Sequence, residues 1–159
     1  AWRGSVVFSA LKQFIEDVSW GELDFLIIDM PPGTGDVQLG VSDLLKQCSF
    51  VIVSTPQNLS YDDVSRATMM LKDMNKPILG LVENMSFFIA PDTKKTYEIF
   101  GTSKGKEFCK NYNINFLGQI PLMMDISNSC EEGKPIIVFG EDYQKQYFKN
   151  ITKQILKNL

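Results

Sequence analysis

The sequence predicts an α/β fold in which a doubly wound, mainly parallel sheet carries helices on both faces. Short apolar runs alternate with amphipathic stretches along the chain, a pattern typical of βα units joined by right-handed crossovers. The runs are apolar throughout rather than alternating, so we expect both faces of the sheet to be buried. With 159 residues, of which 44% are hydrophobic and 22% charged, the chain fits a single domain spanning residues 1–159.

Four apolar runs are expected to form the strands, at residues 25–29, 50–54, 78–84 and 114–120. The first run ends in Asp29. Because ligands of open α/β sheets bind at the carboxyl ends of the strands, the sequence predicts a buried strand that presents this carboxylate at a ligand site.

Helices are expected between and after the strands, within residues 6–18, within 37–47 and from about 141 to 157. A further helix is expected to begin at Ser60, where Ser60 and Asp63 fit a capping box, and to end before Pro77.

The region after the third expected strand is harder to assign from its pattern. Residues 86–96 are the least regular part of the chain, and either an insertion or a β-hairpin would fit there. Residues 101–107 are one residue too short for a Gly-x4-Gly-Lys phosphate loop, so we expect them to start a helix capped by Thr102 or Ser103.

The turn that follows Asp29 has the composition of an anion-binding turn. Pro31 and Pro32 restrict the backbone, whereas Gly33 and Gly35 allow positive φ and close approach, which exposes N–H groups to an anion. A strand that ends in Asp-x-Pro also occurs as a plain structural crossover, so Asp29 alone leaves both interpretations open. The whole turn favours the detection of a phosphate group.

The string Asp29-Met-Pro-Pro-Gly-Thr-Gly-Asp36 closely resembles the corresponding motif of the Mrp/Nbp35 (ApbC) family of P-loop ATPases. The members of this family are related to the MinD and ParA ATPases, and the family is associated with iron–sulfur cluster assembly. Further segments follow the family's order over nearly the whole chain: Trp2-Arg3-Gly4, Ala10-Leu11-Lys12-Gln13-Phe14, Trp20-Gly21-Glu22-Leu23-Asp24, Ser54-Thr55-Pro56-Gln57, Glu83-Asn84-Met85-Ser86, Ile99-Phe100-Gly101 and Gly118-Gln119-Ile120-Pro121.

The resemblance implies a magnesium-dependent ATPase with the P-loop NTPase fold. Members of the family begin with a lysine-bearing phosphate loop and a first switch region, and neither occurs in these residues. The chain is therefore expected to be the distal portion of the ATPase domain and to be inactive alone. Asp29 and Gly33 are the expected catalytic residues: Asp29 would act on magnesium through a bound water, and the Gly33 N–H would bond the γ-phosphate.

The resemblance also implies a nucleobase site at the ends of the later strands. Asn84 matches the asparagine that reads the base, since an amide offers both a donor and an acceptor to a purine edge. The alternative is that Asn84 caps the strand or holds the next turn. Pro121, Leu122 and Met123 correspond to the segment beside the base, and Asp125 could cap the turn that follows.

The cluster-binding motif of the family is replaced in this chain. Ala90-Pro91-Asp92-Thr93 stands where a Cys-x-x-Cys is usual, and Cys48, Cys109 and Cys130 lack the spacing of shared metal ligands. The resemblance implies a 4Fe–4S cluster and iron–sulfur client proteins, with a homodimer for the full-length protein. The residues leave two alternatives: a MinD/ParA-like nucleotide switch without a cluster role, and a non-catalytic interaction module.

Charge and composition exclude several classes of partner. The net charge is −3, too balanced to indicate nucleic acid or an anionic membrane. No apolar run approaches the roughly 20 residues that span a bilayer, and the first residues do not have the pattern of a signal peptide. Three scattered cysteines favour a reducing compartment, either the cytoplasm or an organelle matrix. Because the chain has no histidine, catalysis would depend on carboxylates, lysines and backbone donors.

Overall fold

The computed structural model describes residues 4–30, 36–45 and 47–159. Its centre is a parallel sheet of three strands in the order β1 (Phe50–Ser54), β2 (Ile78–Glu83) and β5 (Phe116–Gln119). All three strands were expected from their apolar runs. The central strand, β2, is buried along almost its whole length, as expected for a strand covered on both faces.

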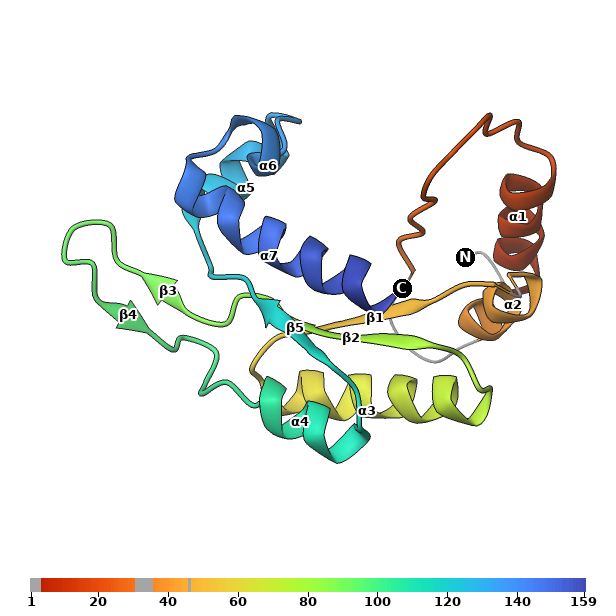
Figure 1. The fold of residues 1–159 in the computed structure, drawn as a ribbon, viewed down its shortest axis with the longest axis horizontal. Helices are drawn as coiled ribbons and strands as arrows, with labels where there is room; N and C mark the ends of the chain where they lie inside the picture. Colours follow the sequence, from red (N-terminus) through yellow and green to blue (C-terminus); the bar gives the residue numbers. More distant parts are fainter. Residues whose placement is uncertain (1–3, 31–35, 46) are drawn as a thin grey trace.

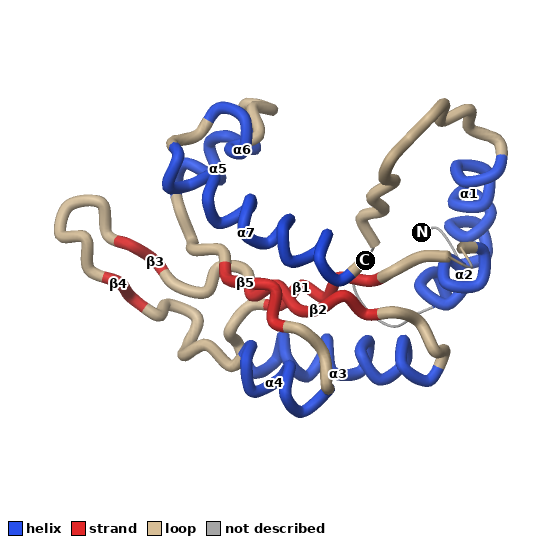
Figure 2. The backbone as a smooth tube through the Cα atoms, in the orientation of Figure 1, coloured by secondary structure: helices blue, strands red, loops and turns tan. Residues whose placement is uncertain are grey.

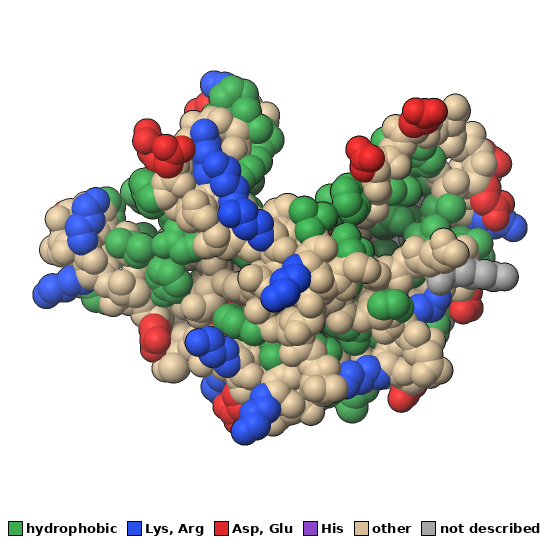
Figure 3. Space-filling model, viewed as in Figure 1, with side chains coloured by type: hydrophobic (Ala, Val, Ile, Leu, Met, Phe, Trp, Pro, Cys, Tyr) green, Lys and Arg blue, Asp and Glu red, His purple; other side chains and the backbone are tan. Residues whose placement is uncertain are grey.

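Helices cover both faces of the sheet, which confirms the predicted fold class (Figure 1). Helices α3 (Asn58–Asp73) and α4 (Gly105–Tyr112) pack on one face, and α7 (Asp142–Asn158) packs on the other. Each parallel strand is therefore joined to the next through a helix, as Figure 2 shows in the colours of helices and strands. Figure 3 shows basic side chains in a line over α7, on its outward side.

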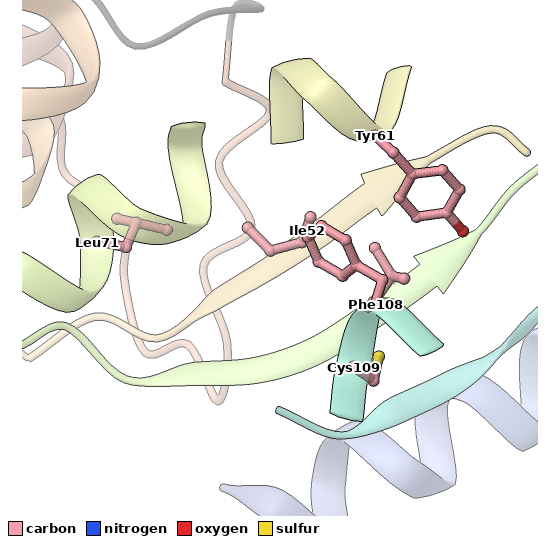
Figure 4. Packing of buried hydrophobic residues seen from close by; sticks show 6 residues of the cluster. Ile52, Tyr61, Leu71, Phe108 and Cys109 are labelled. Atoms are coloured by element: carbon pink, nitrogen blue, oxygen red, sulfur yellow. The ribbon is translucent and has the colours of Figure 1, made fainter. Parts of the chain in front are cut away.

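The main core lies between the sheet and the α3–α4 layer. Figure 4 shows Tyr61 of α3 and Phe108 of α4 meeting over the strands, with their ring centroids 5.3 Å apart. The buried members of this cluster are Ile52, Tyr61, Leu71, Leu81, Phe108 and Cys109. A smaller cluster of Val82, Leu117 and Ile151 joins α7 to the opposite face of the sheet.

Helices α1 (Gly4–Glu16) and α2 (Asp36–Leu44) pack against each other at one end of the molecule (Figure 1). They approach closely at Gly40, where a Cβ would lie 2.3 Å from Phe8 Cδ2. The Lys76 ammonium donates a hydrogen bond to the carbonyl of Ser42 and so ties α2 to the body of the chain. Both helices were expected from the sequence.

At the other end, β5 leads into two short helices, α5 (Met124–Glu131) and α6 (Ile136–Phe139), which the sequence did not predict. Of the two alternatives for the irregular segment, the structure shows the hairpin, as β3 (Phe88–Ile89) paired with β4 (Thr96–Tyr97). It projects from the body of the molecule in Figure 1. Within the part of the chain that the structure describes, no helix is both long and apolar enough to cross a bilayer.

The prediction of a strand at 25–29 was wrong, because this segment forms no strand. Its side chains are exposed instead of buried: Phe25 is 60% and Ile27 91% accessible. A strand needs a hydrogen-bonding neighbour, and among the described residues β1 pairs only with β2, so its other edge is open. Residues 25–29 do not pair with this open edge, so they form no ladder and leave large apolar side chains exposed to solvent.

Two predicted helix caps were also wrong. Helix α3 begins at Asn58, with Gln57 at its N-cap, and the Ser60 hydroxyl instead pairs with the Thr55 hydroxyl at 2.8 Å. Helix α4 begins at Gly105 without a side-chain cap from Lys104, the residue before it. The carboxylate that accepts its first N–H groups comes from β2, outside the helix.

Candidate functional site

The carboxyl ends of the three parallel strands lie in register. Ser54 of β1 is paired with Glu83 of β2, and Glu83 with Gln119 of β5. The residues that follow each strand therefore gather at one edge, where open α/β sheets place their ligands. Asn84 and the 121–123 segment both emerge there.

Backbone hydrogen bonds join the turn after β2 to the segment after β5. The Ile120 N–H donates to the Glu83 carbonyl at 2.9 Å, and the Ser86 N–H donates to the Ile120 carbonyl at 3.0 Å. The Leu122 N–H continues the ladder by donating to the Phe87 carbonyl at 2.7 Å. The structure thus brings together the two segments that were expected to contact a nucleobase.

Asn84 is half-buried at the start of its turn, and its N–H donates to the Ser54 carbonyl at 2.7 Å. Its side-chain Oδ1 accepts the Met85 N–H at 2.9 Å. Met85 has a φ of 52°, which a non-glycine residue adopts only when its surroundings hold it there. The side chain therefore holds the next turn, as the alternative interpretation expected, while the described residues give its Nδ2 no hydrogen-bond acceptor.

The segment after β5 offers both a fixed backbone and an apolar surface. Pro121 is fully buried, and Leu122 forms an isolated parallel bridge with Phe88. Met123 is half-buried and extended at the N-cap of α5. Asp125, in the first turn of α5, accepts a hydrogen bond from the Gln144 side chain at 2.6 Å, so it links α5 to α7.

Asp29 is exposed and lies in irregular backbone after α1. No hydrogen bond or ion pair among the described residues connects it to Asn84 or to the 121–123 segment. Gly33, expected at the γ-phosphate, lies outside the described residues.

A further polar residue at this edge, Glu83, was not expected from the sequence to have a role. It is 0% exposed, and both oxygens of its carboxylate accept hydrogen bonds from groups of the chain. Oε1 accepts the Tyr61 hydroxyl and the N–H groups of Lys104 and Gly105, each N–H at 3.1 Å. Oε2 accepts the Ser86 hydroxyl at 3.0 Å and the Gln119 amide at 2.9 Å.

These hydrogen bonds keep the buried carboxyl ionised. Burial by itself raises the pKa of Glu83, but hydrogen bonds from Ser103, Tyr61, Gln119 and Ser86 outweigh burial and lower the pKa below its ordinary value. The only hint in the sequence was an acidic residue closing an otherwise apolar run, from Ile78 to Val82. Its partners come from four separate parts of the chain, and the sequence pattern does not bring those parts together.

The two titratable groups beside Glu83 are both neutral at pH 7. Burial raises the pKa of the Tyr61 phenol, and the Glu83 hydrogen bond and charge raise it further. Burial likewise raises the pKa of the Cys109 thiol to about 11, with the Glu83 charge acting in the same direction. Glu83 is therefore the one charge in this group of three.

A cavity of about 380 Å³ lies over the partners of Glu83, between the hairpin, α4 and the end of β5. It is lined by Ser86, Phe87, Thr96, Glu98, Ser103, Lys106, Phe116 and Gln119. None of the described residues that were expected to bind nucleotide lines it.

The donor set fits a nucleotide better than it fits a cluster. An amide, a fixed backbone and an apolar wall suit a purine, and an exposed carboxylate such as Asp29 suits magnesium. The cysteines lie apart, with Cys48 after α2, Cys109 in α4 and Cys130 in α5. Across residues 4–30, 36–45 and 47–159, no three metal-ligating side chains gather.

The parallel sheet, the helices on both its faces and the polar carboxyl edge are those of a doubly wound α/β nucleotide-binding protein. In agreement, this chain superposes on a solved structure described as the nucleotide-binding protein in complex with ADP from Archaeoglobus fulgidus, with a TM-score of 0.75 and 36% identity. The match covers 90% of this chain and 57% of that one.

Sequence comparison gives the particular family. A family model described as ParA, NUBPL iron-transfer P-loop NTPase, matches residues 1–156, and the chain belongs to this family. It is 45% identical to an iron–sulfur cluster carrier protein of Deinococcus radiodurans, over 86% of this chain and 39% of that protein. It is 43% identical to the iron–sulfur cluster transfer protein NUBPL of Dictyostelium discoideum, over 99% of this chain and 49% of that protein. The chain thus spans half or less of the length of these two relatives.

Proposed function

We propose that this chain is part of a protein that binds and hydrolyses ATP and carries iron–sulfur clusters to acceptor proteins. The observation that carries the proposal is the backbone pairing between the turn that contains Asn84 and the segment after β5, in which Ser86 bonds Ile120 and Leu122 bonds Phe87. An amide and an apolar segment at one edge of the sheet support a nucleobase site in a chain that belongs to an iron-transfer NTPase family. Similarity to relatives named as cluster carriers supports the cargo.

Different residues of this chain would contact the base, the magnesium ion and the γ-phosphate of the nucleotide. Asn84 would use its amide Nδ2 to contact the purine edge, and Pro121, Leu122 and Met123 would line one side of the base. Asp29 would hold a water of the magnesium ion, and the Gly33 N–H would bond the γ-phosphate. Magnesium, when bound, neutralises charge on the β- and γ-phosphates.

The cluster is the cargo, and the described cysteines do not form its ligand set. We propose that the whole protein acts as a homodimer in a reducing compartment, cytoplasm or organelle matrix, and serves iron–sulfur client proteins. The residues of this chain alone are expected to bind ATP with magnesium weakly, since a phosphate loop with its lysine does not occur among them.

An asparagine substitution tests the nucleotide site. In the natural polypeptide that contains these residues, Asn84→Ala is expected to weaken ADP binding about tenfold, because one polar contact to the base is lost. Isothermal titration measures the affinity. Asn150→Ala, an exposed residue of α7, is the matched control and should bind like the parent. Equal affinities for Asn84→Ala and the control would contradict the assigned role.

Reconstitution tests the cargo. The natural polypeptide, incubated anaerobically with iron and sulfide, is expected to acquire the visible absorption of a cluster and to pass it to an apo-ferredoxin. A protein that binds ADP but acquires no cluster would contradict the carrier function. That result would favour the MinD/ParA-like nucleotide switch instead.

A further inference from the structure

The buried carboxylate of Glu83 connects four parts of the fold. Tyr61 reaches it from α3, Ser86 from the turn after β2, the N–H groups of Lys104 and Gly105 from the start of α4, and Gln119 from β5. Every partner donates a hydrogen bond. A carboxylate satisfies all of these donors, because it offers two acceptor oxygens and no competing proton.

Glu83 also lies at the junction of the two segments that would contact the base. It immediately precedes Asn84, and its carbonyl accepts both the Ile120 N–H at 2.9 Å and the Ser86 hydroxyl at 2.8 Å. The side chain therefore ties β2 to β5 at the point where their backbones also pair. Asn84 can keep its position only while these two strand ends stay in register.

The strained turn makes this position dependent on its surroundings. Met85 adopts a φ of 52°, and its N–H is held by the Asn84 side chain. Ser86, the next residue, is 2% exposed and bonds Glu83 through its hydroxyl. Both ends of the turn are therefore attached to the same glutamate, which leaves Asn84 little freedom to rotate.

We propose that Glu83 is a positioning residue for base recognition: its carboxylate fixes the Asn84 amide relative to the 121–123 segment and so sets the preference for adenine. This inference rests on the proposed function, since it takes Asn84 as the group that reads the base. Glu83 itself touches no nucleotide.

The test measures base selectivity, because loss of folded protein would weaken the binding of every nucleotide equally. Dissociation constants for ADP and GDP are determined for the natural polypeptide and for Glu83→Gln. The amide keeps the shape of the side chain but presents an N–H₂ to donors. We expect ADP affinity to fall about tenfold and GDP affinity to change less than about twofold, so that the preference for adenine is largely lost.

Two further variants separate positioning from folding. A double variant that combines Glu83→Gln with Gln119→Glu restores an amide–carboxylate pair between β2 and β5. It is expected to recover most of the preference for ADP over GDP. Glu107→Gln, an exposed carboxylate in the first turn of α4, makes the same change in charge and should leave both constants unchanged. If Glu83→Gln does not fold, Gln119→Met removes one donor to Glu83 and is expected to lower selectivity in the same direction.

The outcomes distinguish this inference from the function on which it rests. A parent protein that binds neither nucleotide would overturn both. A parent that prefers ADP, with a Glu83→Gln variant that keeps this preference or loses both affinities equally, would overturn the positioning role alone. Where only Gln119→Met can be measured, unchanged selectivity would do the same.

Discussion

At the residue scale, burial determines the reactivity of Cys109, a cysteine beside the buried glutamate. Cys109 is 5% exposed, and burial together with the Glu83 charge raises its thiol pKa to about 11. The thiolate is the reactive form, so at pH 8 this thiol should resist alkylation. Cys130 is exposed and serves as the internal control.

We expect iodoacetamide to modify Cys130 at pH 8 within minutes and to leave Cys109 unmodified until the chain is unfolded in urea. Mass spectrometry of tryptic peptides follows both sites. Equal rates for Cys109 and Cys130 in the folded chain would show that the α4 side of the core is open to solvent.

The residues of the candidate site could be predicted only in part from the sequence. Asn84 and the 121–123 segment were proposed from the resemblance to the family, and the structure shows that both follow strands at the same edge of the sheet. Glu83 was missed because hydrogen-bond donors from α3, α4 and β5 give it its role. Those donors are 21 to 36 residues away along the chain, farther than any local pattern extends.

At the element scale, β2 depends on a glycine where its pairing with β1 is irregular. Gly80 has a φ of 150°, and a Cβ there would lie 2.3 Å from the Asn115 carbonyl oxygen. We expect Gly80→Ala to lower the free energy of unfolding by about 3 kcal/mol, through both the clash and the backbone strain. Urea unfolding monitored by circular dichroism measures this loss.

Gly133→Ala separates the two causes. Gly133 has a φ of 64°, but nothing lies within 4 Å of a Cβ built on it. Only the backbone strain applies, so a loss of about 1 kcal/mol is expected. If both variants lost the same free energy, the close contact with Asn115 would be irrelevant to stability.

The elements were predicted well where local pattern and tertiary partner agree. Strand β1 was found with its exact bounds and helix α7 to within a residue, since each has a continuous apolar face and a layer to bury it. The 25–29 run has the composition of a strand but no partner strand among the described residues. Helix α6 was missed because four apolar residues carry no helical period.

At the scale of the whole molecule, the two outer strands of the sheet, β1 and β5, each have an unpaired edge among the described residues. Strand β1 pairs on one side only among the described residues, and Val53 on it is 55% exposed. An open, apolar edge strand can pair with another chain. We therefore expect the 159-residue chain to associate as its concentration rises, and Val53→Lys to weaken this association about tenfold, as measured by sedimentation velocity.

Leu59→Lys is the control for this effect. Leu59 lies on α3 with 74% of its surface exposed, so the change adds the same charge and removes similar apolar area away from the edge. It should leave the association unchanged. A parent chain that stays monomeric at every concentration would show that the edge is protected in solution.

The β3–β4 hairpin is held by two residue pairs, Phe88 with Tyr97 and Ile89 with Thr96. Phe88, at the base of the hairpin, also forms a bridge with Leu122. Beyond Ile89, the described residues of the hairpin pair with no strand outside it. Extra residues inserted at the tip would cost little closure entropy and would break no hydrogen bond of the central strands. The hairpin can therefore change length during evolution as long as Phe88 stays paired with Tyr97 and bridged to Leu122. New contacts can then arise at its tip while the main fold is preserved.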